Sequence, residues 1–124
     1  MKLTSLLFAD FLRCPTKCYL RSTGQVGMGN AYAEWVREHN EAYKIEAAQR
    51  LMEAVSEAER VVAPPAGENL KTATWRLALD LPVQAGDMEA GLHAVERVPS
   101  QGRGKPAQFI PVRFIPFNKL AKDD

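Results

Sequence analysis

The sequence predicts an α+β domain in which N-terminal helices, one of them long, precede a three-stranded antiparallel meander. Two observations support this fold class. Apolar residues recur every three or four positions through the first half of the chain, which is typical of amphipathic helices. After the Pro64–Pro65 pair they alternate with polar residues, which is typical of half-buried strands. The 124 residues suffice for a single domain, 1–124.

Two short helices are predicted at the N-terminus. Thr4 or Ser5 can cap the first, which runs to about residue 11. Pro15 suits the first position of the second, because its missing N–H would have no helical partner there. The residue before a proline is pushed out of the helical region, so Cys14 lies at a break between the two helices. The glycine-rich segment 22–29 predicts a loop, and its spacing matches no phosphate-binding loop.

A long helix over 30–62 is predicted next, with Asn30 as its cap. At this length it would span about 45 Å. Its apolar residues predict one buried stripe, which consists of Tyr32, Trp35, Val36, Tyr43, Ala47, Leu51, Val55, Ala58 and Val62. We expect Tyr32 and Trp35 to lie in the core; stacking on nucleic-acid bases is the alternative.

Three strands are predicted after the proline-rich segment 63–70, over 72–81, 88–98 and 108–117. Apolar side chains are expected to share one face of each of the first two strands. These are Trp75, Leu77 and Leu79, then Met88, Ala90, Leu92 and Ala94. Prolines at 111 and 116 indicate that the third strand is an edge strand or is bulged.

Composition limits the class of protein. No apolar run approaches the roughly 20 residues that span a bilayer, and no signal-peptide cleavage site follows the N-terminus. We therefore expect a cytoplasmic protein without a targeting segment. The two cysteines, Cys14 and Cys18, predict reduced thiols or part of a metal site rather than a disulfide framework. Arg13 and Lys17 favour the thiolate form of Cys14, which is the form that binds metal.

Charge is nearly balanced, at +1, but it is unevenly distributed. Basic residues dominate both ends, whereas 30–62 holds seven glutamates against four basic residues. If the fold brings the two ends together, they would suit a phosphate backbone; the alternative is ordinary solvated surface. The candidate nucleic-acid-binding residues are Arg13, Lys17, Arg21, Arg103, Lys105 and Arg113.

Two stretches resemble a known family. The pattern F-x-x-C-P-x-K-x-Y-L at residues 11–20 resembles the N-terminal motif of RecB-like nucleases, in particular the CRISPR-associated exonuclease family. The stretch from Leu92 to Phe114, LHAVERVPSQGRGKPAQFIPVRF, resembles the RecB-like nuclease branch found beside or fused to helicases. Together they cover about a third of the chain.

The resemblance implies the N-terminal portion of a restriction-endonuclease-like core, truncated after its third strand. It also implies hydrolysis of DNA ends or single strands with Mg²⁺ or Mn²⁺. A 4Fe–4S cluster is implied, with Cys14 as a ligand; Cys18 falls where the family usually has another residue. Such clusters typically take four cysteines, so this chain cannot complete one alone. The implied partners are DNA and a helicase domain or CRISPR-type protein.

The family's catalytic positions fall on substituted residues. Its second-strand Asp falls within Gly91–Ala94, where His93 is the side chain able to take that role. Its third-strand Glu and Lys fall on Arg113 and Ile115. Arginine cannot bind Mg²⁺, so we expect this catalytic site to be degenerate. Glu96 is a candidate replacement carboxylate and, with His93, a candidate metal ligand.

Each candidate also has a structural interpretation. Asp80 and Asp87 are further candidate carboxylates, but both lie near strand ends. His93 can equally be a partly buried, hydrogen-bonded histidine on a strand, and Glu96 an exposed carboxylate beside Arg97.

Three functions follow from the sequence. The first is a relative of metal-dependent DNA nucleases that is inactive as this fragment. The second is a non-catalytic module that binds nucleic acid or docks a partner. The third is a structural helix–sheet adaptor without nucleic acid.

Overall fold

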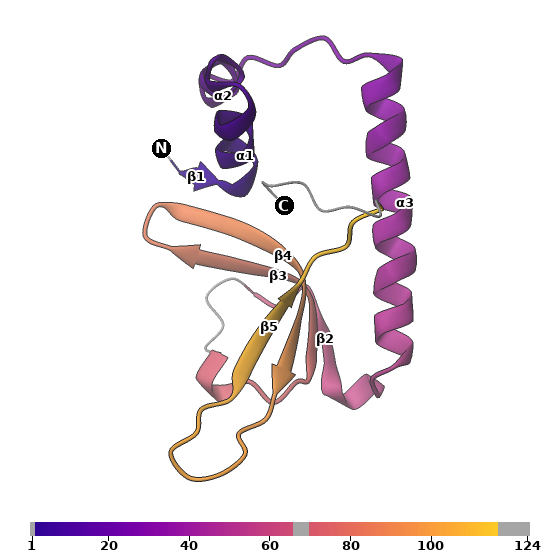
Figure 1. Ribbon diagram of the computed structural model, residues 1–124, viewed down its shortest axis with the longest axis vertical. Helices are drawn as coiled ribbons and strands as arrows, with labels where there is room; N and C mark the ends of the chain where they lie inside the picture. The colour runs from indigo at the N-terminus through magenta and orange to yellow at the C-terminus, as the bar shows by residue number, and fades with distance from the viewer. Residues whose placement is uncertain (1, 66–69, 117–124) are drawn as a thin grey trace.

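The computed structural model describes residues 2–65 and 70–116 (Figure 1). Within these ranges the chain forms three α-helices and one five-stranded sheet, so the α+β class is confirmed. The helices are α1 (Ser5–Arg13), α2 (Pro15–Ser22) and α3 (Ala31–Glu53). The strands are β1 (Leu3–Thr4), β2 (Arg60–Val62), β3 (Leu77–Ala85), β4 (Met88–Val98) and β5 (Gln108–Val112).

The N-terminal helices begin where the local signals predict, but both run further than expected. Helix α1 continues to Arg13 instead of about residue 11, and Ser22, expected in the loop, is the last residue of α2. The Thr4 hydroxyl accepts a hydrogen bond from the N–H of Leu7 (3.1 Å) and so caps α1. Cys14 is extended, with φ −159°, and separates α1 from α2, which starts at Pro15. The side chain of Asn30 caps α3 by accepting from the N–H of Ala33 (2.7 Å).

Helix α3 is shorter than predicted, because it ends at Glu53 rather than Val62. The Arg60 guanidinium donates to the carbonyl oxygens of Met52 (2.6 Å) and Val55 (3.5 Å). Carbonyls at a helix C-terminus lack helical partners, so this contact stabilises the end. A 3₁₀ turn (Glu57–Glu59) follows, and residues 60–62 then form β2. The sequence pattern predicts a helix at Val61 and Val62, but these β-branched residues pair with β3.

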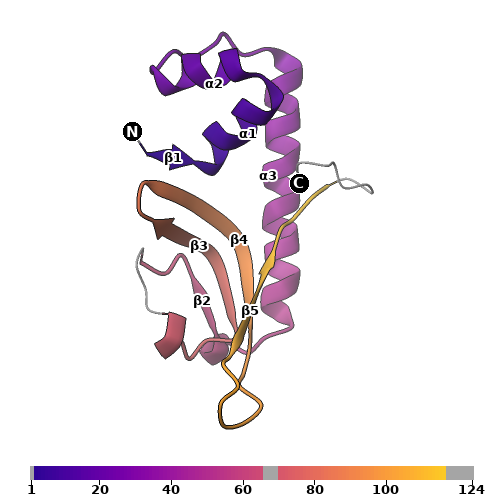
Figure 2. The same cartoon turned by 60° about the vertical axis from the view of Figure 1, so that its left-hand side comes forward.

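The expected buried stripe on α3 is wrong for the first half of the helix. Tyr32 is 74% exposed and Trp35 58% exposed, and no residue of α3 is buried. The helix packs on the sheet through its second half, by way of Ala48, Leu51 and Met52. Its first half extends beyond the sheet (Figures 1 and 2).

The sheet is mixed rather than a meander. The strand order is β1-β4-β3-β2, and β5 also pairs with β4, which already pairs with β1 and β3. Strand β4 is antiparallel to both β3 and β5, as expected. However, β1 is parallel to β4 and β2 is parallel to β3. These two strands have two and three residues, which is too short to produce an alternating pattern.

Strand boundaries also differ from the prediction. Residues 70–72 form a 3₁₀ turn, and β3 begins at Leu77 instead of residue 72. Strand β4 covers 88–98, as predicted. Strand β5 ends at Val112, before its expected end at residue 117, which lies outside the described residues.

The β3–β4 hairpin changes the face it presents to the core. Leu79 lies in the cluster that packs against α3, whereas Leu81 lies in the cluster around Trp75. Alternate residues of a regular strand share a face, so the expectation of one apolar face per strand is wrong. The switch occurs at Asp80, whose φ is +51°. On the paired strand β4, Leu92 packs against the cluster around Trp75, whereas Ala94 lies in the cluster that packs against α3.

Candidate nucleic-acid interface

A groove of about 570 Å³ lies between α1, β4 and the segment that follows β5. It is lined by Ser5, Leu6, Phe8, Ala9, Leu12, Arg13, Ala90, Gly91, Leu92, His93, Pro111, Val112 and Arg113. Arg13 is the last residue of α1 and Arg113 directly follows β5, one hundred residues later in the sequence. One basic residue from each half of the chain therefore lines this groove. No Asp or Glu is among its lining residues in the described chain.

The floor of the groove is an edge of β4. Strand β1 pairs with this strand at Met88 and Glu89, and β5 pairs with it from Ala94 onward. The Asp87 carbonyl accepts from the N–H of Leu3 (2.7 Å) on the same edge. Because alternate residues direct their backbone groups to the same edge, the N–H and C=O of Gly91 also face it.

Two further observations on Gly91 agree with this. It lies opposite Pro82 of β3, which has no N–H to donate across the pair. A Cβ added at Gly91 would meet nothing within 4 Å. The backbone of Gly91 is therefore accessible to a ligand in the groove.

His93 is a half-buried residue of β4. Its Nδ1 accepts a hydrogen bond from the N–H of Phe114 (3.1 Å), and the two rings stack at 5.7 Å. Burial lowers the pKa of His93, and the positive charges of Lys44 and Arg113 lower it further. The neutral ring therefore carries its proton on Nε2, because Nδ1 is the acceptor. This environment matches the structural interpretation of a hydrogen-bonded strand histidine.

A charged pair lies near His93, between α3 and the sheet. Lys44 Nζ is 3.0 Å from Asp80 Oδ1. Asp80 falls in register with His93, since its neighbours Leu79 and Leu81 pair with the residues on either side of that histidine. The carboxylates of Asp80 and Glu41 oppose the lowering of the His93 pKa.

The residues around His93 do not fit the implied Mg²⁺ or Mn²⁺ site. These ions prefer carboxylate oxygens, whereas Asp80 is paired with Lys44 and Arg113 stands at the expected Glu position. Glu96 is an exposed residue three positions along β4, about 10 Å away by strand rise. Asp87 lies in the β3–β4 turn. Within residues 2–65 and 70–116, no three His, Cys, Asp or Glu side chains form a group that could hold a metal ion.

The two cysteines lie one helical turn apart. Cys14 is exposed at the N-cap of α2, and Cys18 is half-buried within this helix. The whole sequence contains no other cysteine. Alone it cannot supply the four thiolates that a 4Fe–4S cluster typically takes.

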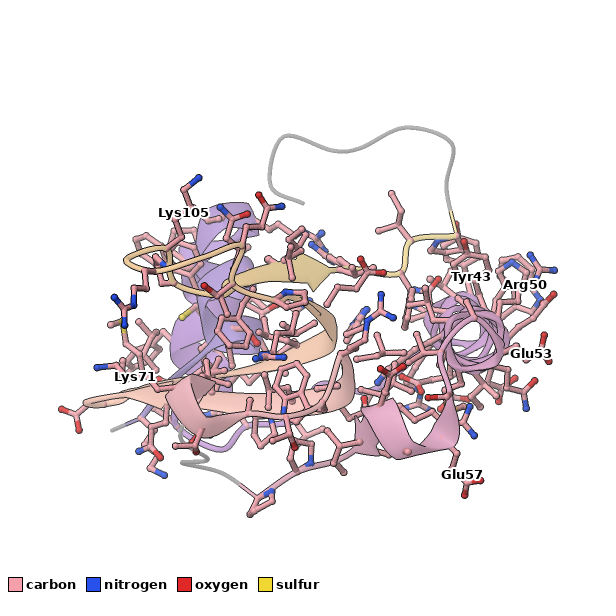
Figure 3. The ribbon with its side chains drawn as sticks, turned by 90° about the horizontal axis from the view of Figure 1, so that it is seen from below. Tyr43, Arg50, Glu53, Glu57, Lys71 and Lys105 are labelled. Carbon is pink, nitrogen blue, oxygen red and sulfur yellow. The ribbon has the colours of Figure 1, made fainter. Side chains whose placement is uncertain are left out.

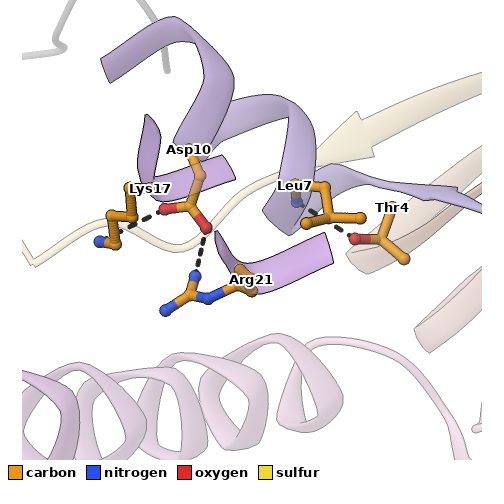
Figure 4. A network of polar contacts seen from close by, with 5 residues as sticks. All are labelled: Thr4, Leu7, Asp10, Lys17 and Arg21. Atoms are coloured by element: carbon orange, nitrogen blue, oxygen red, sulfur yellow. Dashed lines mark hydrogen bonds and ion pairs between the residues drawn. The ribbon is translucent and has the colours of Figure 1, made fainter. Parts of the chain in front are cut away.

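An ion-pair network holds α1 against α2 (Figure 4). Asp10 is only 4% exposed, and its carboxylate contacts Lys17 Nζ (3.3 Å) and the guanidinium of Arg21. Lys17 and Arg21, predicted as nucleic-acid ligands, thus have a structural contact inside the chain. Sequence reasoning did not single out Asp10, although an acidic residue within the apolar string of α1 was the available signal.

The predicted nucleic-acid residues fall in three places. Arg13 and Arg113 line the groove, and Lys17 and Arg21 surround Asp10. Arg103 and Lys105 lie in the β4–β5 connection, at the opposite end of the molecule from α1 and α2 (Figures 1 to 3). The six residues therefore do not form one continuous surface.

Comparisons with protein-family models, with curated proteins and with solved structures find no match. The resemblance to RecB-like nucleases is confined to the two sequence stretches. No helix among the described residues is long and apolar enough to cross a membrane.

Proposed function

We propose that this chain is a nucleic-acid-binding module, related to RecB-like nucleases, that binds the phosphate backbone of DNA in the groove without cutting it. We expect it to act in the cytoplasm, beside a helicase or CRISPR-type partner. The observation that supports the proposal is that Arg13 and Arg113 line one groove that contains no acidic lining residue among the described ones.

The chemistry of the groove suits a phosphate. Each guanidinium can form two parallel hydrogen bonds to phosphate oxygens. The N–H of Gly91 and the Nε2–H of neutral His93 add two uncharged donors. The apolar side chains of Leu6, Phe8 and Leu12 line the α1 side of the groove.

Binding without hydrolysis follows from the substituted third strand. A two-metal nuclease needs carboxylates to hold its ions and a group that orients the attacking water. Arg113 and Ile115 offer neither. An active enzyme with Mg²⁺ or Mn²⁺ is the alternative that the family resemblance implies.

The binding proposal is tested with Arg113→Glu and fluorescence anisotropy of labelled DNA at several salt concentrations. We expect wild-type affinity to fall steeply with salt, because phosphate contacts release counterions. The variant should bind at least about tenfold more weakly, since it replaces an attraction by a repulsion. Lys105→Glu is the matched control, because it makes a similar charge change in the β4–β5 connection, outside the groove. Equal losses in both variants, or salt-independent binding, would contradict the proposal.

Incubation of the same DNA with Mg²⁺ or Mn²⁺ separates the module from the enzyme. We expect intact DNA in both reactions. Cleavage that a chelator abolishes, and that a repeated preparation reproduces, would contradict the non-catalytic function and favour the nuclease.

A further inference from the structure

The first half of α3 exposes a stack of three rings. The Tyr32 and Trp35 rings are 6.2 Å apart, and the Trp35 and His39 rings are 5.3 Å apart and nearly parallel. We call these three residues the aromatic stripe. Large exposed aromatic residues are typical of protein interfaces, where Trp and Tyr provide much of the binding energy.

The aromatic stripe faces away from the sheet and from the other helices of the described chain. At 3.6 residues per turn, its residues lie on the side of α3 opposite Ala48 and Met52, which pack on the sheet. Arg50 and Glu53, on the outer side, point away from the sheet in Figure 3. Helices α1 and α2 lie on the same side of α3 as the sheet (Figure 1). They cannot cover the stripe of their own chain without a large movement.

The outer side of α3 is also acidic. Helical spacing places Glu38, Glu46 and Glu53 on or beside it, against Arg50, which is paired with Glu46. A partner surface that complements this side should be both apolar and basic.

The α1–α2 hairpin is such a surface. Its exposed apolar residues are between 39% and 67% accessible, and they are Leu6, Phe8, Phe11, Leu12, Tyr19 and Leu20. Its charged residues are three basic, Arg13, Lys17 and Arg21, against one acidic, Asp10. The hairpin joins α3 through the segment 23–30, which contains three glycines. Both surfaces are therefore present in every copy of the chain.

We propose that the aromatic stripe and the outer side of α3 bind the α1–α2 hairpin of a second copy of this chain. The contact is reciprocal: each copy offers one hairpin and one stripe, so a twofold axis closes the dimer. The hairpin residues Leu6, Phe8, Leu12 and Arg13 also line the groove, so the dimer would cover part of it. The two proposals are still tested separately, because the aromatic stripe lies outside the groove.

The first test is the molar mass by light scattering and the sedimentation equilibrium over a hundredfold range of protein concentration. We expect twice the 13.8 kDa of a single chain, with dissociation on dilution. Trp35 emission should shift to shorter wavelength on association, whereas Trp75 is already buried and should change little. Trp35→Ala should weaken association at least about tenfold, and alanine preserves the helix.

Charge exchange tests the pairing of the two surfaces. Glu38→Lys and Lys17→Glu should each weaken the dimer, and the double variant should associate more strongly than either single variant. Glu57→Lys is the matched control outside both surfaces and should have no effect. Lys17→Glu also alters the Asp10 network, but Glu38→Lys tests the same pairing from the other side. A chain that stays monomeric throughout, or a dimer unaffected by Trp35→Ala and Glu38→Lys, would overturn the proposal.

Discussion

Asp80 occupies the left-handed backbone region, with φ +51°, in the middle of β3. This conformation costs free energy for any residue other than glycine, and Asp and Asn tolerate it better than most. Its carboxylate also pairs with Lys44 on α3. One residue therefore turns the strand and ties it to the long helix.

Substitutions at this position separate the two roles. Asp80→Asn removes only the ion pair, which is half-exposed, and should lower the unfolding free energy by about 0–1 kcal/mol. Asp80→Ala also places a strained residue in the left-handed region, which should cost about 1–2 kcal/mol more. Urea unfolding of both variants measures the difference. Equal stability of the two would show that the backbone conformation contributes nothing.

His93 makes stability depend on pH. Its pKa is lowered from the ordinary value of 6.5 by burial and by Lys44 and Arg113. The unfolded chain therefore takes up this proton at higher pH than the folded chain does. The contribution of His93 is fully present above pH 6.5 and is lost as the pH falls through that value towards the folded pKa. Protonation also ends the hydrogen bond from Phe114, because Nδ1 can no longer accept.

The measurement is urea unfolding in buffers above and below pH 6.5. The free energy of unfolding of the wild type should decrease as the pH is lowered through this range. For His93→Gln the decrease over the same range should be smaller. His39→Gln is the matched control, because it removes the chain's other histidine. A His93→Gln variant that keeps the full wild-type pH dependence would rule out this origin.

At the scale of elements, α1 and α2 depend on one buried charge. Neither helix has a buried apolar residue, so the Asp10 network provides the contact that the core provides elsewhere. Helix α3 differs, because apolar contacts hold its second half on the sheet. The first half of α3 makes no contact with the described core clusters.

Removing the Asp10 carboxylate should therefore loosen the hairpin locally. Asp10→Ala leaves Lys17 and Arg21 without this partner, although both are partly exposed and can be solvated. We expect a loss of about 1–3 kcal/mol in local stability, measured as faster hydrogen exchange of the α2 amides. The β3 and β4 amides are the internal control and should exchange as in wild type. Unchanged exchange in α2 would contradict a stabilising role for the network.

At the scale of the whole molecule, the groove exists because two strands share one edge of β4. Strand β1 occupies the edge near Met88, β5 occupies it from Ala94, and the residues between them remain as the floor. Helix α1 follows β1 directly, so it brings Arg13 to the place where β5 delivers Arg113. The order of the strands thus places Arg13 and Arg113 along the same groove.

Local signals were sufficient for much of the fold. The Asn30 cap, the break at Cys14 and the limits of β4 depend on residues next to one another, and the sequence predicts each of them. For the first helix the sequence allows Thr4 or Ser5 as the cap, and the structure has Thr4. The pattern could not reveal β1 and β2, because strands of two or three residues show no period. The end of α3 was missed because it depends on Arg60, which lies beyond the helix.

The sequence by itself determined the class of the fold, its helix starts and the basic character of its ends, because these follow from neighbouring residues and composition. Only the tertiary structure decided which apolar residues are buried and which basic residues meet. Tyr32 and Trp35 have a core-like spacing, yet α3 extends past the sheet and exposes them. Arg13 and Arg113 line one groove because β1 and β5 both pair with β4, and this pairing joins residues far apart in the chain.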